Sequence, residues 1–468
     1  MKYFNKALIL FPFFAVLITT VNADSIDDFI KNTIAKRKIP GLSLAVVRDG
    51  KVIRANGYGF ANLELKVPAT KDTVYEIGSI SKQFAAEAVM LLVEEGKINL
   101  DDSIAKYLPA NAPQIWQKIT VRNLLNHTSG LKDWTEVKEF SYRREYSPEE
   151  FIDLVKSFPL TFQPNDNWLY SNTNLPLIGT IVERASGKPF EEFVIERILK
   201  PLNFPSFRFN QQEDVVADRA AGYVLRNDVW KNGEPFRPRV IAPSGGVLAS
   251  AVDLARWWEA VLQGRLVKPA SLEQMLKPAK LNDGRSVSHG FSFFTNTFNG
   301  YKFIFHAGST VGGFGSMVYY FPKDKLTVAV IGNLEDGGFG AEYIAKRVFN
   351  FYIPGTYVGG LKEVIDVNQT QTNLQILKAI ADRKNPESLS ANFASRMPET
   401  FRKQLGENLK QMKAFAYIGN EKIGENHFML DAAAAEFFRY KMTLANKTVY
   451  YHFRMNKDGK IGWIIFEE

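Results

Sequence analysis

The sequence predicts an α+β protein whose main domain holds one antiparallel sheet, built from both ends of that domain around an inserted helical region. Strand-like runs occupy residues 42–47 and 51–58, helical patterns dominate residues 100–204, and strand-like runs return at 301–306, 314–321 and 326–332. Strands separated in this way bury their apolar faces by joining one sheet that helices cover. A smaller α+β module is expected after this domain.

Length and composition set the domain organisation. The chain has 468 residues, of which 46% are hydrophobic, enough for more than one core. We predict a signal peptide over 1–23, a main domain over 24–355 and a C-terminal module over 360–468, because Pro and Gly pairs mark residues 354–360. The net charge of +8 comes from scattered residues, which argues against a nucleic-acid partner. The absence of cysteine excludes disulfides and thiol catalysis.

The N-terminus has the pattern of a secretory signal. Lys2 and Lys6 precede an apolar run over 7–18, and a small-residue cleavage site ends at Ala23. A membrane-spanning helix needs about 20 apolar residues, and this run is shorter and broken by Pro12. We therefore expect cleavage after Ala23, a secreted or periplasmic protein, and no integral membrane segment in the mature chain.

The remaining elements follow from periodicity and turn residues. Residues 25–37 form an amphipathic pattern, and Asp49-Gly50 between the first two strands is a strong hairpin signal. Further helices are expected at 120–125, 148–158, 175–185, 253–262 and 340–352, and a strand near 245–248. In the module, helices over 372–383 and 388–409 precede strands over 438–444, 448–455 and 461–466, an order that suits a cystatin-like or NTF2-like cone.

Residues 78–82 (GSISK) open an apolar helix that stops at Gly96. Ser79 and Lys82 are three residues apart and share one face of that helix. Ser79 alone would suit an N-cap, and a lone S-x-x-K is a weak motif. However, a capping box would place Glu or Gln where Lys82 stands, and the positive end of the helix dipole lowers a lysine pKa. A partly neutral amine beside a hydroxyl is what a serine nucleophile needs.

Two other segments carry candidate chemistry. Residues 170–172 (YSN) lie in a polar loop before the helix at 175–185, and by themselves suit a helix-start loop. Residues 306–308 (HAG) end a strand and lead into a glycine-rich run over 309–316, which by itself suits a turn or bulge. A nucleotide-binding loop fits poorly, because no lysine follows the glycines and no helix begins there.

Together, the three segments resemble in order and spacing the active-site motifs of the serine β-lactamase and penicillin-binding-protein superfamily. The similarity is strongest to the class C-like branch, which has Tyr-x-Asn second and H-x-G third and includes D,D-carboxypeptidases, D-amino-peptide hydrolases, family VIII esterases and LACTB-like proteins. Residues 119–131 (ITVRNLLNHTSGL) and 244–250 (SGGVLAS) also match. The resemblance covers residues 25–350 and implies a serine β-lactamase-like fold there, but it does not extend to the module.

The resemblance implies an acyl-enzyme mechanism that needs no cofactor. Ser79 would attack a carbonyl carbon, and Lys82 with Tyr170 would relay its proton to the leaving group. Either Lys82 or Tyr170 could be the acylation base. Asn172 would hold the substrate amide and orient Lys82.

The third motif would supply the substrate-binding strand, through His306, Gly308 and Ser309. The backbone N–H groups of Ser79 and Ser309 would form the oxyanion hole. Related enzymes with Lys-Thr-Gly at this place offer an ammonium and a hydroxyl to a substrate carboxylate, whereas this chain offers a mostly uncharged imidazole and Ala307. We therefore expect weak recognition of a free carboxylate and poor β-lactam hydrolysis.

The expected function is a secreted serine hydrolase of esters or peptide amides, with a small-molecule or peptide substrate such as a peptidoglycan fragment. A β-lactamase and a non-turnover penicillin-binding or scaffolding protein of the cell envelope are the alternatives. His127 is interpreted as a structural loop residue, and His289, His427 and His452 lack metal-ligand spacing, so no metal is expected. The substrate, the oligomeric state and the role of the module stay open.

Overall fold

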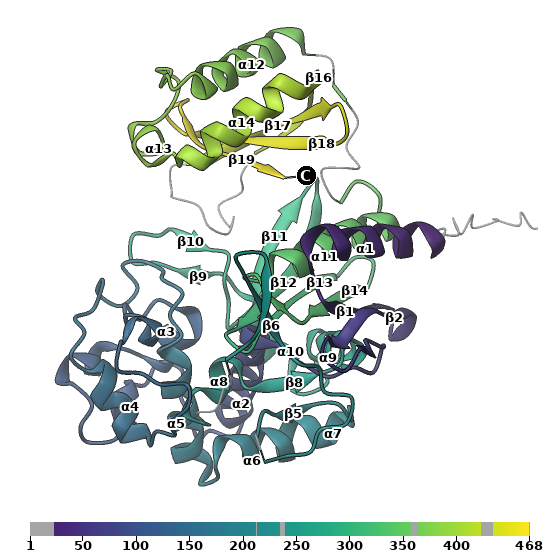
Figure 1. Ribbon diagram of the computed structural model, residues 1–468. Coiled ribbons are helices and arrows are strands. Elements are labelled where there is room, and N and C mark those ends of the chain that lie inside the picture. Colours follow the sequence, from purple (N-terminus) through teal and green to yellow (C-terminus); the bar gives the residue numbers. More distant parts are fainter. Residues whose placement is uncertain are drawn as a thin grey trace, which may run out of the picture.

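A computed structural model describes residues 23–467, apart from 212, 235–238, 357–362, 365 and 423–433 (Figure 1). Residues 1–22 of the predicted signal peptide lie outside the described residues, and helix α1 (Ala23–Arg37) begins where cleavage is predicted. The predicted boundary at 355–360 also lies largely outside them. The predicted α+β class, with antiparallel sheets and a small C-terminal sheet module, is confirmed.

The main domain is organised on a seven-stranded antiparallel sheet with the order β11-β12-β13-β14-β1-β2-β3. Strands from the two ends of the domain meet at β14 and β1, where Ala45 lies opposite Ala329. The predicted closure of the sheet is therefore correct, although β3 and β11 were not predicted. The strands are β1 (Gly41–Arg48), β2 (Lys51–Asn62), β3 (Val67–Pro68), β11 (Phe294–Phe298), β12 (Tyr301–Thr310), β13 (Phe314–Phe321) and β14 (Leu326–Gly332).

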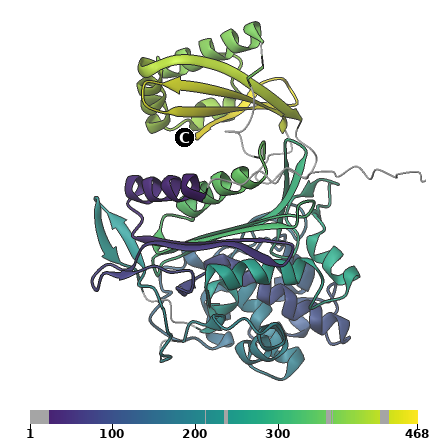
Figure 2. The same cartoon turned by 90° about the vertical axis from the view of Figure 1, so that its right-hand side faces the viewer.

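Helices cover both faces of this sheet (Figure 2). On one face α1 and α11 (Phe339–Tyr352) pack through buried aliphatic residues such as Ile30 and Ile344. On the other face lie α2 (Lys82–Glu94), α9 (Ala251–Leu262) and the inserted helical region. That region contains α3 (Val121–Asn126), α4 (Pro148–Val155), α5 (Asn174–Ser186), α6 (Phe190–Val194) and α7 (Lys200–Leu202), and it is followed by α8 (Ala242–Gly245) and α10 (Pro269–Leu276).

Three small sheets complete the main domain. One of them matters for the site, because β8 (Val247–Ala249) pairs with β4 (Tyr75–Glu76), the strand that leads into the GSISK segment. Its third strand is β5 (Arg208–Phe209). The other two sheets combine β15 (Leu334–Glu335) with β6 (Tyr223–Arg226) and β7 (Val229–Asn232), and β9 (Ala279–Lys280) with β10 (Ser286–Val287).

The C-terminal module packs helices on one face of a four-stranded antiparallel sheet. The helices are α12 (Val367–Ala381), α13 (Ala391–Arg396) and α14 (Glu399–Gln411), and the strands are β16 (Met412–Lys422), β17 (Ala434–Leu444), β18 (Thr448–Asn456) and β19 (Ile461–Glu467). Leu377 of α12 and Leu405 of α14 are fully buried against Tyr440 and Tyr451. The three predicted strands are confirmed, and β16 is an additional one.

The other face of the module sheet contacts the hairpin formed by β11 and β12 (Figure 1). The guanidinium of Arg439 lies 4.5 Å from the ring centroid of Phe298, at the tip of that hairpin. Ile418 and Tyr450 are buried in the apolar cluster that also includes Phe298 and Tyr301. Strand β12 therefore has one end at the module and its other end at the third motif.

Candidate active site

Ser79 lies in a 3₁₀ turn, η1 (Gly78–Ser81), that precedes α2. Ile77 and Ser81 occupy the N-cap positions of η1 and α2, so the N-cap interpretation of Ser79 does not apply. Lys82, the first residue of α2, donates from Nζ to Ser79 Oγ over 2.9 Å and to the backbone carbonyl of Ser244 over 2.8 Å. Ser79 itself is half-buried. The structure therefore places a nucleophile and an amine in direct contact.

Burial determines the charge of Lys82. Its side chain is fully buried, and this desolvation lowers its pKa to about 7, while the negative charge of Asp133 acts in the opposite direction. About half of the amine is then neutral near pH 7. The dominant cause of the low pKa is therefore desolvation, and not the predicted effect of the helix dipole.

Tyr170 completes the centre. Its phenol interacts with the side chain of Ser79, and Lys82 Nζ lies 5.1 Å from its ring centroid. Burial raises the pKa of Tyr170, so the phenol keeps its proton at neutral pH. The imidazole of His127 stacks on the ring at 4.5 Å with an interplanar angle of 19°.

His127 is held by its own backbone and by its neighbours. It ends α3 in a left-handed conformation with a φ of 59°, and its Nδ1 accepts from the N–H of Ser171 over 3.1 Å and from Asn174 Nδ2 over 3.0 Å. Burial holds its pKa well below the usual range. These contacts support the interpretation of His127 as a structural residue that supports Tyr170.

Asn172 has a different partner from the one expected. Its backbone N–H and its side-chain Nδ2 each donate to Asp133 Oδ2 over 2.9 Å. The backbone carbonyl of Ser244, rather than Asn172, is the second acceptor for Lys82. Lys82 is therefore oriented by Ser244 and not, as was predicted, by Asn172. Asn172 instead connects the loop of Tyr170 to the segment that contains Asp133.

The backbone of the third motif (306–308) packs directly against the backbone of the segment that carries Ser79. A Cβ added to Gly308 would lie 2.1 Å from the carbonyl oxygen of Ile77, and one added to Gly78 would lie 2.6 Å from Ser309 N. Gly78 also has a φ of 55°, which favours glycine. The close approach brings the backbone of Ser309 beside that of Ser79, as an oxyanion hole requires.

His306 is buried and uncharged at neutral pH. Its Nδ1 is hydrogen-bonded to the carbonyl oxygen of Ala307 over 2.6 Å, and desolvation lowers its pKa to about 3. The methyl group of Ala307 packs in the cluster beneath α11, on the opposite face of the sheet from His306. Ala307 therefore does not line the site, and the expected weak recognition of a carboxylate depends on the uncharged imidazole of His306 alone.

Sequence reasoning did not find three contributors to the site. Asp133 and the carbonyl of Ser244 contact the motif residues only after the chain has folded. Asp133 follows the segment 119–131 that the resemblance singled out, and Ser244 begins the segment 244–250. His289 packs against His127, with ring centroids 5.1 Å apart. Of the other histidines, His452 lies in β18 and His427 lies outside the described residues. The described part of the chain contains no cluster of three or more His, Asp or Glu suited to a metal ion.

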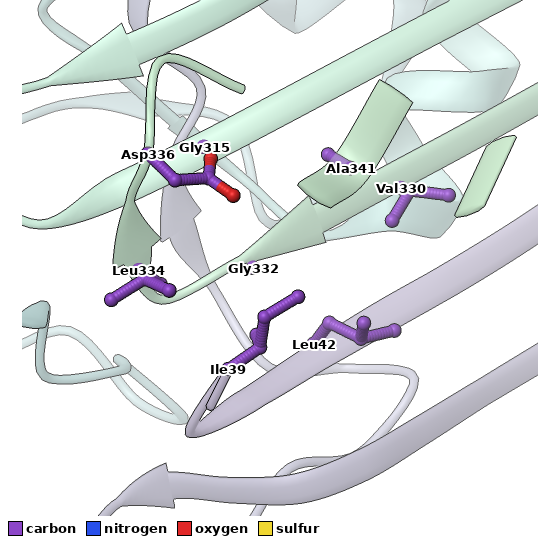
Figure 3. A pocket seen from close by; sticks show the side chains of 8 residues that line it. All are labelled: Ile39, Leu42, Gly315, Val330, Gly332, Leu334, Asp336 and Ala341. Carbon is purple, nitrogen blue, oxygen red and sulfur yellow. The ribbon is translucent and has the colours of Figure 1, made fainter. Parts of the chain in front are cut away.

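A small cavity of about 10 Å³ lies between the sheet and the start of α11 (Figure 3). Its lining includes Leu42, Val330 and Ala341, which belong to the α1 and α11 side of the sheet. Asp336 faces it but already accepts hydrogen bonds from the N–H groups of Gly338 and Gly340. This cavity holds at most one water-sized molecule and is separate from Ser79.

A model of the Beta-lactamase family matches residues 26–351, which span the whole site. The chain belongs to this family. Among curated proteins it is 27% identical to Protein flp of Staphylococcus aureus (strain MRSA252), over 71% of this chain and 66% of that protein. It is also 27% identical to Penicillin-binding protein 4* of Bacillus subtilis (strain 168), over 64% and 70% of the two chains. The chain thus spans about two thirds of the length of the staphylococcal protein.

Solved structures of this family extend the comparison. An octameric penicillin-binding protein homologue from Pyrococcus abyssi matches with a TM-score of 0.61 and 26% identity, over 96% of this chain and 99% of that one. A D-stereospecific amidohydrolase from Streptomyces matches with a TM-score of 0.58 and 25% identity, over 68% and 97%. The first of these matches includes the C-terminal module. In the described residues, no helix has the length and apolar character needed to cross a bilayer.

Proposed function

We propose that the protein is a secreted serine hydrolase that forms an acyl-enzyme with esters or peptide amides, including those of D-amino acids. The contact of Ser79 Oγ with the amine of a fully buried lysine carries this proposal. The likeness to a D-stereospecific amidohydrolase and to penicillin-binding proteins supports the substrate class. The signal-like N-terminus supports secretion.

The pKa values favour Lys82 as the base in acylation. Near pH 7 its neutral amine accepts the proton of Ser79 as Oγ bonds to the substrate carbonyl carbon. The carbonyl oxygen becomes an oxyanion that the N–H groups of Ser79 and Ser309 stabilise. Tyr170, which keeps its proton, donates to the leaving group as the acyl bond breaks, and recovers a proton from Lys82. Water then attacks the acyl-enzyme and releases the acid.

The buried His306 disfavours substrates that depend on a free carboxylate. With a pKa of about 3, the imidazole carries no charge at neutral pH, so it offers no ion pair. Esters and amides whose acyl group is neutral are the substrates that this environment suits best. A β-lactam, which carries a carboxylate, is expected to react more slowly.

Intact-mass spectrometry tests the proposal directly. The wild type is mixed with an activated ester, a D-Ala-D-Ala peptide and penicillin, and each adduct is followed as it forms and decays. We expect an adduct with the ester that disappears on turnover and is absent in Ser79→Ala. Turnover by Ser79→Ala would refute the proposal, and an adduct that never decays would favour a non-turnover penicillin-binding protein.

A further inference from the structure

Ser316 of β13 connects the substrate-binding strand to the segment that carries the nucleophile. It lies opposite Gly308 in the β12–β13 pairing and is fully buried. Its Oγ donates to the carbonyl oxygen of Ile77 over 2.9 Å. Ile77 stands two residues before Ser79, so this hydrogen bond joins the two backbones that would form the oxyanion hole.

The hydrogen bond lies where the two backbones are already in contact. An added Cβ on Gly308 would lie 2.4 Å from Ser316 Oγ as well as 2.1 Å from the Ile77 oxygen. A Cβ added to the next residue, Gly78, would lie 2.6 Å from the backbone N of Ser309. A movement of the Ile77 carbonyl therefore changes how the following turn sits against Ser309.

A second contact holds the residue before Ile77. The carboxyl of Glu76 is buried, and a Cβ added to Gly312 would lie 2.5 Å from its Oε2. Asn210 Nδ2 donates to Glu76 Oε1 over 2.9 Å. The segment is therefore fixed at the β12–β13 turn by Glu76 and in the middle of the hairpin by Ser316. Both contacts lie on the approach to Ser79 and make no use of Lys82.

We propose that Ser316 is a positioning residue that sets the separation of the two oxyanion-hole donors, the backbone N–H groups of Ser79 and Ser309. The inference rests on the proposed function and adds a requirement to it. Loss of the hydroxyl leaves the Ile77 carbonyl with the longer hydrogen bond from the N–H of Ile80, at 3.4 Å, in place of the 2.9 Å bond from Ser316. The loosened segment then weakens binding of the transition state more than binding of the substrate, because these donors are aimed at the oxyanion. A displacement of about 1 Å can cost roughly 100-fold in rate.

Ser316→Ala tests the inference, with Thr180→Val as the matched control. Thr180 is also a buried residue whose hydroxyl donates to a backbone carbonyl, that of Pro176 over 3.1 Å, but it lies within α5. With an activated ester we expect Ser316→Ala to lower kcat at least tenfold with KM within twofold of wild type. Affinity for an arylboronic acid, which forms a tetrahedral adduct with the serine, should fall in proportion to kcat/KM. The pH midpoint of kcat/KM should not move, and Thr180→Val should behave as wild type.

The outcomes separate this inference from the proposed function. If Ser316→Ala keeps the wild-type kcat and boronate affinity while Ser79→Ala forms no adduct, the inference is wrong and the proposed function stands. If Ser79→Ala still turns over, the proposed function itself fails. If Ser316→Ala does not fold, Ser316→Cys decides instead, because the thiol fills the site but is a weak donor. Wild-type kinetics in that variant would refute the inference.

Discussion

The pH dependence of Lys82 offers the sharpest test of the catalytic centre. Desolvation lowers its pKa from 10.5 to about 7. If the neutral amine is the base, kcat/KM rises with pH and reaches half of its plateau near pH 7. An ordinary lysine would be neutral in roughly 3 molecules of 10,000 at that pH, so burial increases the reactive fraction about 1,000-fold.

The same shift affects stability. Because the pKa of Lys82 is lower in the folded state, the free energy of unfolding increases as the pH rises from about 7 to 10.5 and decreases as the pH falls through the same range. The 3.5-unit difference corresponds to at most about 5 kcal/mol of unfolding free energy. Lys82→Met should therefore be inactive and more stable than wild type at pH 6. The hydrogen bonds that Lys82 makes to Ser79 and Ser244 offset part of this gain.

Two substitutions test the assignment of Lys82 as the catalytic base. Lys82→Arg cannot deprotonate and should lose activity by orders of magnitude. Asp133→Asn removes the charge that raises the pKa of Lys82, so the midpoint of kcat/KM should move to lower pH, while its side-chain oxygen can still accept from Asn172. Glu136→Gln, at an exposed acid paired with Lys132, is the control and should leave the midpoint unchanged. A flat profile, or an active Lys82→Arg variant, would refute the reasoning.

Four further substitutions test separate features. Gly308→Ala should lower kcat at least 100-fold in an ester assay, because its Cβ would lie 2.1 Å from the Ile77 oxygen; near-wild-type kcat would contradict the close approach. Tyr170→Phe should slow acylation more on amides than on esters with good leaving groups, and equal rate losses in stopped-flow would count against proton donation. Burial raises the pKa of Glu87 to about 8, so the free energy of unfolding falls as the pH rises from 4.5 to 8. Glu87→Gln should therefore raise Tm more at pH 8 than at pH 5, and a larger increase at pH 5 would contradict this assignment of the pKa. His306→Lys should raise the kcat/KM ratio for carboxylate-bearing over neutral substrates about tenfold, and an unchanged ratio would show that the motif serves geometry alone.

The centre of the sheet could be predicted because its strands β13, β14 and β1 are continuous apolar runs. Residues 326–332 are buried along their whole length, so no periodicity was needed to recognise β14. The strands that were not predicted lack a continuous apolar run. β11 is short and has Thr-Asn-Thr between its two terminal Phe residues, and β16 contains Gly419 and two irregularities in its pairing. Such strands are defined by their partners more than by their own residues.

Only part of the site could likewise be predicted from the sequence. Ser79 and Lys82 could be paired from sequence because three residues along a helix determine their separation. The acceptor at Ser244 and the charge at Asp133 come from distant segments, and the matches at 119–131 and 244–250 did not say which atoms would contact Lys82 or Asn172. The burial of Lys82 is also a property of the whole fold. Its pKa therefore follows from tertiary structure, even though its direction could be anticipated.

The contact between the module and the β11–β12 hairpin matters for any attempt to study the main domain alone. A protein shortened to residues 24–356 would retain every motif residue of the site. It would also leave the rings of Phe298 and Tyr301 without Arg439, Ile418 and Tyr450 as cover. Newly exposed apolar surface of this kind promotes self-association. Poor solubility of such a fragment would report the lost cover at the hairpin tip, some 25 Å along β12 from Ser309 by the usual rise per residue, and would not by itself indicate a damaged catalytic centre.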